Sequence, residues 1–388
     1  MIEEVVAMFI PAFRPRAALI VTCLCLAVAM PAAAQTAADA AARFAELEVK
    51  VKNAPVAVET LADVQSLSFG SRIAPLLTDA DIALMRFLPN LGSASLDGLK
   101  GVTPKGLSQL SNVPKLWRLS LRGSEITDAH AAVLPGMPGV KNLDFTTNAG
   151  LSDAAMPTIA AMPALTDLKL DATGVTDIGL AALSGHKTLK ALSLSRTAVT
   201  DAGLVHLAAI STLQTLAITD TGVTGAGLEP IAALPNLQEL SLMNSKVDDI
   251  GAWHIGKMVS LKRLFAWNTL ITDNGMVWFK NLANLEVIYL DRTGVTDAGL
   301  AALAGLPKLR TVWLNGTAVG DAGMAHLANL PLASVQIGQT QVGDAGLLVL
   351  AQIPTLTNIS ARGSKVTEAG VAAAMALPGR NPGLSISR

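Results

Sequence analysis

Residues 293–300 read Thr-Gly-Val-Thr-Asp-Ala-Gly-Leu, and variants of this stretch recur along the chain of 388 residues. The acidic position marks the repeat, because it returns every 23 to 25 residues, most often as Asp. The thirteen markers are Asp79, Pro104, Asp128, Asp153, Asp177, Asp201, Gly225, Asp249, Asp273, Asp297, Asp321, Asp344 and Glu368. A single period of this length predicts a repeat architecture, in which each unit completes its core by stacking on its neighbours.

Each repeat predicts a strand, a turn and a short helix. Alternating apolar residues such as Leu192 and Leu194 indicate a strand with two side chains in the core. The turn carries Thr or Ser, for example Thr173, whose hydroxyl can hydrogen-bond to neighbouring backbone. The Thr-Asp pair then predicts an N-cap, with the Asp carboxylate satisfying the free N–H groups of its own helix. Parallel pairing of successive strands predicts an α/β solenoid with the sheet inside and the helices outside.

The stretch at 293–300 resembles the bacterial 24-residue class of leucine-rich repeats, similar in pattern to the repeats of F-box partners and ribonuclease inhibitor. The resemblance covers about residues 64–388 and departs from the commonest pattern in having Thr where many members carry Asn or Cys. It implies a curved horseshoe of about 13 repeats, with a parallel sheet on the concave face and short helices on the convex face. It also implies binding through the concave sheet, usually of protein, without naming a ligand.

A secretory leader is expected at the N-terminus. An apolar run over residues 17–30 follows Arg14 and Arg16, and small residues end the segment at Ala34. This order is typical of a signal peptide. We therefore expect residues 1–34 to be cleaved off and the mature chain to be periplasmic or secreted, without membrane insertion. A retained anchor helix is the alternative.

The domain organisation follows from the leader and the repeats. Acidic residues close to Met1 are unusual in a signal peptide, so a translation start at Met8 stays open. Residues 35–63 are rich in Ala and Glu around Phe44, which predicts a helical N-terminal cap. The leucine-rich-repeat solenoid is expected over 64–388.

Charge and motifs argue against nucleic acid and against catalysis. The chain has 29 basic and 30 acidic residues, a net charge of −1, which gives no reason to expect a nucleic-acid partner. Cys23 and Cys25 lie in the expected leader, and the motifs of hydrolases, zinc proteases and phosphate loops are missing from the sequence. His206, His254 and His326 share one helical position but lie two and three repeats apart. We therefore expect no enzymatic activity, no cofactor and no metal site.

Aromatic residues are concentrated between residues 253 and 313. Core-facing Leu264 turns Phe265 outward, and the same alternation turns out the next rings along the sheet. Four rings are therefore expected to be exposed together, bordered by four other side chains. We call this set the concave patch, formed by Phe265, Trp267, Tyr289, Trp313, Met243, Asp291, Asn315 and Arg263.

The concave patch predicts a binding site for a protein or peptide, because exposed rings are not needed to fold a repeat and are common at binding hot spots. One alternative is that the rings pack on one another without a ligand. Others are binding of a cell-envelope glycan, or a structural envelope protein with no discrete ligand. A ubiquitin-transferring effector is disfavoured, because we find neither a catalytic cysteine nor an F-box. Trp253 and Trp278 fall on the helical side, where convex packing is favoured over a second site.

The leader yields a direct prediction. N-terminal sequencing of the exported protein should begin at Gln35, the residue after the expected cleavage site. A mature form that begins before residue 20 would contradict the leader.

Overall fold

A computed structural model describes residues 36–51, 54–70 and 72–388, so the expected leader lies outside the described residues. The described chain divides into two compact units, residues 36–124 and 125–388. Within these ranges, no helix has the length and apolar character needed to span a bilayer.

The first unit begins with the expected helix, α2 (Ala37–Glu46), which is capped by Thr36 and buries Phe44 completely. The rest of this segment is not α-helical, because an antiparallel hairpin and a 3₁₀ helix follow. An ion pair ties α2 to the first repeat, since the Arg43 Nε lies 2.7 Å from the Asp81 Oδ1 and both residues are 4% exposed. The elements are β1 (Lys50–Val51), β2 (Ala54–Pro55), β3 (Ser66–Ser68), α3 (Asp79–Leu84), β4 (Ser93–Ser95), α4 (Pro104–Ser108) and β5 (Arg118–Ser120).

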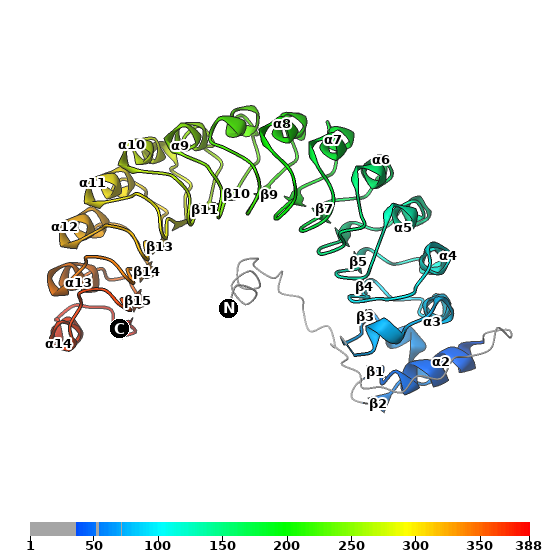
Figure 1. Ribbon diagram of the computed structural model, residues 1–388. Coiled ribbons are helices and arrows are strands. Elements are labelled where there is room, and N and C mark those ends of the chain that lie inside the picture. The colour runs from blue at the N-terminus through cyan, green and yellow to red at the C-terminus, as the bar shows by residue number, and fades with distance from the viewer. Residues whose placement is uncertain (1–35, 52–53, 71) are drawn as a thin grey trace. The chain divides into compact units, whose positions relative to one another are not determined.

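The second unit is a solenoid whose strands pair in parallel, each with the next along the chain. In Figure 1, the strands of this unit line the inner side of a curve and helices α5 to α14 line its outer side. The strands are β6 (Asn142–Asp144), β7 (Asp167–Lys169), β8 (Ala191–Ser193), β9 (Thr215–Ala217), β10 (Glu239–Ser241), β11 (Arg263–Phe265), β12 (Val287–Tyr289), β13 (Thr311–Trp313), β14 (Ser334–Gln336), β15 (Asn358–Ser360) and β16 (Ser385–Ser387).

The outer layer of this unit is built from helices of one to three turns. They are α5 (Asp128–Ala131), α6 (Met156–Ala160), α7 (Asp177–Leu180), α8 (Asp201–Leu204), α9 (Asp249–Ile255), α10 (Asp273–Met276), α11 (Asp297–Leu300), α12 (Asp321–Met324), α13 (Asp344–Ala351) and α14 (Glu368–Ala376). The coil marked by Gly225 has a 3₁₀ helix over Ala226–Ile231 instead.

The core and the turns follow the expected pattern. Leu192 and Leu194 are at most 1% exposed, so the alternating strand residues do face the core. The Thr173 hydroxyl donates to the backbone oxygen of Leu170 at 2.6 Å, as equivalent hydroxyls do in later coils. The residue before it, Ala172, has a φ of 52°, and this left-handed position recurs in most coils of the unit.

The repeated Asp joins one coil to the next instead of capping its own helix. Asp177 is the first residue of α7, and the N-cap is Thr176, whose side chain accepts from the N–H of Ile178. The Asp177 carboxylate accepts two hydrogen bonds from Thr200 of the following coil, from its N–H at 2.7 Å and from its hydroxyl at 2.6 Å. The predicted N-cap is therefore confirmed for the Thr of the pair, and the expected role of the Asp was wrong. The same paired contact recurs at Asp79–Thr103, Asp128–Ser152, Asp153–Thr176, Asp201–Thr224, Asp249–Thr272, Asp273–Thr296 and Asp344–Thr367.

A Gly two positions after most of the markers makes room for the Asp of the preceding coil. A Cβ at Gly203 would lie 2.4 Å from the Asp177 Oδ1, and one at Gly299 would lie 2.3 Å from the Asp273 Oδ1. Thr, Asp and Gly therefore recur together because all three belong to one contact between neighbouring coils.

A double-mutant cycle tests this contact. Asp177→Ala should lower the free energy of unfolding by about 1 kcal/mol, because two hydrogen bonds to the next coil are lost. Gly203→Ala should cost about 1 to 3 kcal/mol, because the new methyl group collides with the carboxylate. The double variant should lose clearly less free energy of unfolding than the two single variants lose together, because removing the carboxylate relieves the collision. Urea denaturation measures all three, and Gly305→Ala is the matched control because nothing lies within 4 Å of its added Cβ. Additive losses would contradict the shared contact.

Candidate functional site

Three of the predicted rings form a continuous row on the inner sheet. The register places Phe265 beside Tyr289 and Tyr289 beside Trp313. The Phe265 and Tyr289 ring centroids are 4.9 Å apart at 55°. The Tyr289 and Trp313 rings are stacked, 3.7 Å apart and 10° from parallel. Because their strand neighbours Leu264 and Ile288 are fully buried in the core, the row lies on the opposite face of the sheet.

The exposure of these rings differs from the prediction. Phe265 is only 4% exposed, and Tyr289 and Trp313 are half-buried. The reason is geometric, since large side chains on strands about 4.8 Å apart must cover one another. Packing of rings across the sheet therefore explains the burial of Phe265, as the alternative without a ligand predicted. Tyr289 and Trp313 keep part of their surface accessible.

The fourth ring, Trp267, lies just beyond the end of β11 and is half-buried. The guanidinium carbon of Arg292 lies 5.7 Å from the centroid of its ring, within the range of a cation–π contact. Sequence alternation missed Arg292, because its left-handed φ of 52° turns its side chain out of the strand pattern. The polar residues that recur at this turn position, such as Arg196, Asn244 and Asn268, were the sequence signal that could have identified it.

Two of the predicted polar border residues are bound to each other. Asp291 is 7% exposed and accepts hydrogen bonds from Asn315, from its N–H at 3.0 Å and from its side-chain amide. The same amide donates to the Gln336 Oε1 at 2.8 Å, and the Asn315 Oδ1 accepts from the N–H of Gly338 at 2.7 Å. This network extends across three coils and holds the polar side chains in place.

Of the other two border residues, one is packed and the other is ion-paired. Met243 is 8% exposed, so it is part of the packed surface. Arg263 lies at the other outward position of β11 and pairs with Glu239, its Nε 2.5 Å from the Glu239 Oε2. Glu239 is 6% exposed and was not predicted as part of the site.

Burial raises the pKa values of two acidic groups in the concave patch, Asp291 and Tyr289. The pKa of the Asp291 carboxyl is raised by burial, although the hydrogen bonds from Asn315 and the charge of Arg292 oppose the shift. The pKa of the Tyr289 hydroxyl is raised to about 12, by burial and by the nearby charge of Asp291. Both groups therefore favour their protonated forms more than they would in water.

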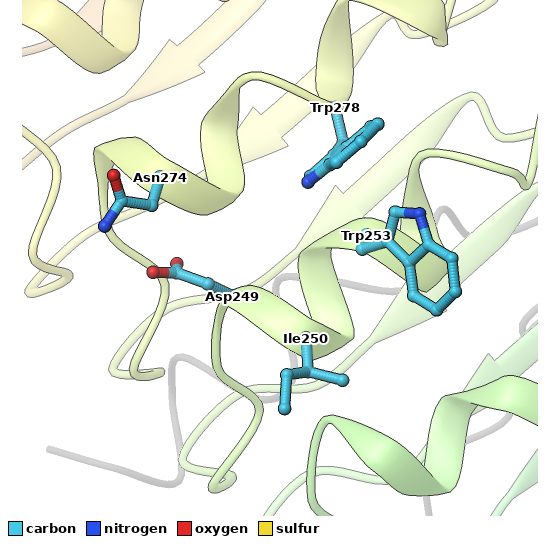
Figure 2. A pocket seen from close by; sticks show the side chains of 5 residues that line it. All are labelled: Asp249, Ile250, Trp253, Asn274 and Trp278. Carbon is cyan, nitrogen blue, oxygen red and sulfur yellow. The ribbon is translucent and has the colours of Figure 1, made fainter.

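Trp253 and Trp278 lie on the outer helical layer, where the sequence predicted convex packing. They remain 40% and 39% exposed and line a cleft of about 420 Å³ together with Asp249, Ile250 and Asn274. Figure 2 shows the two indoles and the polar side chains on the two neighbouring coils that form the cleft. About two fifths of the surface of each of these residues therefore remains accessible.

The described residues offer no group of three or more His, Cys, Asp or Glu side chains arranged to hold a metal ion. His254 is 3% exposed, and burial lowers the pKa of its imidazole.

The fold and repeat pattern match those of known leucine-rich-repeat proteins. Residues 185–208 and 209–232 match a family model described as Leucine Rich repeat. The structure is similar to an internalin, InlF, from Listeria monocytogenes, with a TM-score of 0.62 and 21% identity over 86% of this chain and 88% of that chain. A leucine-rich-repeat protein from Leptospira interrogans aligns at a TM-score of 0.45 and 15% identity over 85% of this chain and 97% of that chain. None of the curated proteins compared with the chain matches it significantly. The expected leucine-rich-repeat fold is confirmed.

The single tyrosine of the chain allows a direct test of the row. A rapid jump to high pH, followed by tyrosinate absorbance before unfolding, should give a midpoint of about 12. Since the folded pKa is raised above the ordinary value of 10, stability should fall as pH rises from about 10 to about 12. Asp291→Asn should lower the midpoint, because it removes a negative charge beside the ring. A midpoint near 10 in the folded protein would contradict the described packing.

Proposed function

Because the chain is a leucine-rich-repeat protein, we propose that it is an exported, non-enzymatic binding protein that recognises a protein or peptide through the concave patch. The observation that carries the proposal is the row of rings on the inner sheet. Phe265 forms its buried end, while Tyr289 and Trp313 keep accessible surface on consecutive strands.

The row is suited to binding because its side chains are held in place before any partner arrives. Tyr289 and Trp313 stack at 3.7 Å, and Arg292 lies over the ring of Trp267. Ordering a flexible side chain on binding costs about 0.5 to 1.5 kcal/mol, so held rings lose less on association. Aromatic anchors of this kind are enriched among binding hot spots.

The polar border favours a peptide over a glycan at this face. The sugar alternative relied on Asp291 and Asn315 as partners for hydroxyl groups. Asp291 is 7% exposed, and Asn315 uses both ends of its amide within the protein. The accessible part of the row is thus mainly aromatic, which suits apolar or aromatic side chains of an extended segment.

Export rests on the expected leader, residues 1–34, with cleavage after Ala34. A periplasmic or secreted location would place the partner among proteins of the cell envelope or the extracellular medium. A structural envelope protein without a discrete ligand is the remaining alternative.

Replacing Trp267 and Trp313 together by Ala tests the concave patch. Immobilised protein lacking its leader is incubated with cell-envelope proteins of the organism that makes it, and captured proteins are identified by mass spectrometry. The double variant should lose a partner that the unaltered protein retains, because the accessible rings are removed. Its melting temperature should fall, because half-buried ring surface is lost together with stacking worth about 0.5 to 1.5 kcal/mol, so capture is measured at a temperature where circular dichroism shows the double variant to be folded.

Trp117→Ala is the matched control, because Trp117 is 45% exposed and belongs to the other unit of the chain. It should leave capture unchanged. Equal capture by the double variant, or no reproducible partner with the unaltered protein, would instead favour the structural alternative.

A further inference from the structure

The cleft on the outer face is formed by two coils that depart from their neighbours. Trp253 lies four residues after its marker Asp249, a position held by Ala301 and Ala325 in later coils. Trp278 lies five residues after its marker Asp273, a position held by Ala182 and Ala302 in other coils. Since a small residue suffices there for folding, the two indoles are not required by the repeat.

The indoles are exposed in an apolar part of the surface. Ile250 is 55% exposed and Val277 is 48% exposed, beside the two indoles at about 40%. Concentrated exposed apolar surface of this kind is typical of binding sites. The cleft is shallow and open to solvent, so it suits a ligand that lies along the surface.

Neighbouring residues hold both rings. The backbone at Gly256 approaches Trp278 so closely that an added Cβ would lie 2.7 Å from the Trp278 Cβ. The Lys257 ammonium lies 3.4 Å from the centroid of a Trp253 ring. The coil that contains Gly256 therefore leaves space for Trp278, and the Lys257 ammonium covers part of Trp253.

The polar side chains of the cleft lie at the starts of the two helices, as Figure 2 shows. The Asp249 carboxylate is held by Thr272, whose N–H donates at 2.7 Å and whose hydroxyl donates at 2.6 Å. Asn274 is exposed, and its side-chain amide has no partner among the described residues. The cleft thus combines aromatic surface with a fixed acceptor and a free amide.

We propose that this cleft binds sugar rings of an uncharged glycan, as a second site separate from the concave patch. The apolar C–H face of a sugar can stack on an indole, while its hydroxyl groups meet a carboxylate and an amide. One ammonium, that of Lys257, and one carboxylate, that of Asp249, lie at the cleft, so its charges balance and do not select a charged ligand of either sign. A purely apolar ligand would leave the exposed amide of Asn274 without a partner in the cleft.

Indole N–H resonances of ¹⁵N-labelled protein provide the test, because the chain has only five tryptophans. Each resonance is assigned from a single Trp→Phe variant. The probes are chitotetraose and maltotetraose as uncharged glycans, with tetramethylammonium as a cationic control. One of the two oligosaccharides should shift the Trp253 and Trp278 resonances saturably, and those of Trp117, Trp267 and Trp313 should not move.

Calorimetric titration of variants completes the test. Trp253→Ala with Trp278→Ala should weaken oligosaccharide binding at least about tenfold, because both stacking surfaces are lost. Asn274→Ala should weaken it severalfold, and Trp117→Ala should not change it. The resonance measurement uses the unaltered protein, so it remains decisive if the double variant folds poorly.

Three results would overturn the proposal. One is no saturable shift of Trp253 and Trp278 with either oligosaccharide up to about 10 mM, the weak end of specific binding. Another is a saturable shift of these resonances with tetramethylammonium instead. The third is a sugar-induced shift confined to Trp267 and Trp313, which would place the glycan on the concave patch.

Discussion

Most coils are tied to the next by an Asp carboxylate that accepts two hydrogen bonds from one residue of the following coil. Asp177 and Thr200 show the contact in full, and Gly203 provides the space it needs. The contact lies at the start of each helix, away from the sheet, so it fixes the outer layer while backbone hydrogen bonds fix the inner one. Two attachments per coil, on opposite sides of the core, restrict how far neighbouring coils can slide or rotate.

This restriction is what allows side chains of separate coils to act together. Tyr289 and Trp313 are 24 positions apart in the sequence, yet their rings stack at 3.7 Å because β12 and β13 are held in register. The same register places Phe265 beside Tyr289, where it is buried, and aligns Asp291 with Asn315. The row of rings is therefore partly structural and partly accessible, and a binding role uses only its accessible part.

The inner and outer faces offer different chemistry on neighbouring coils. On the inner face the polar groups of Asp291 and Asn315 are used within the protein, which leaves an aromatic surface. On the outer face Asn274 keeps its amide free beside two exposed indoles. A peptide on one side and a glycan on the other would not compete for space, because the core separates the two faces.

The sequence by itself determined the period, the alternation of core and surface positions, and the alignment of the three rings, because these depend on local geometry repeated every coil. It did not reveal that Asp177 contacts Thr200, since an N-terminal Asp can equally serve its own helix and only the neighbouring coil decides between the two. It also predicted that Phe265 would be exposed, whereas this side chain is buried, and it did not reveal how much of Trp253 is exposed. Exposure depends on which side chains of adjacent coils cover a residue, and that covering is set by the tertiary structure alone.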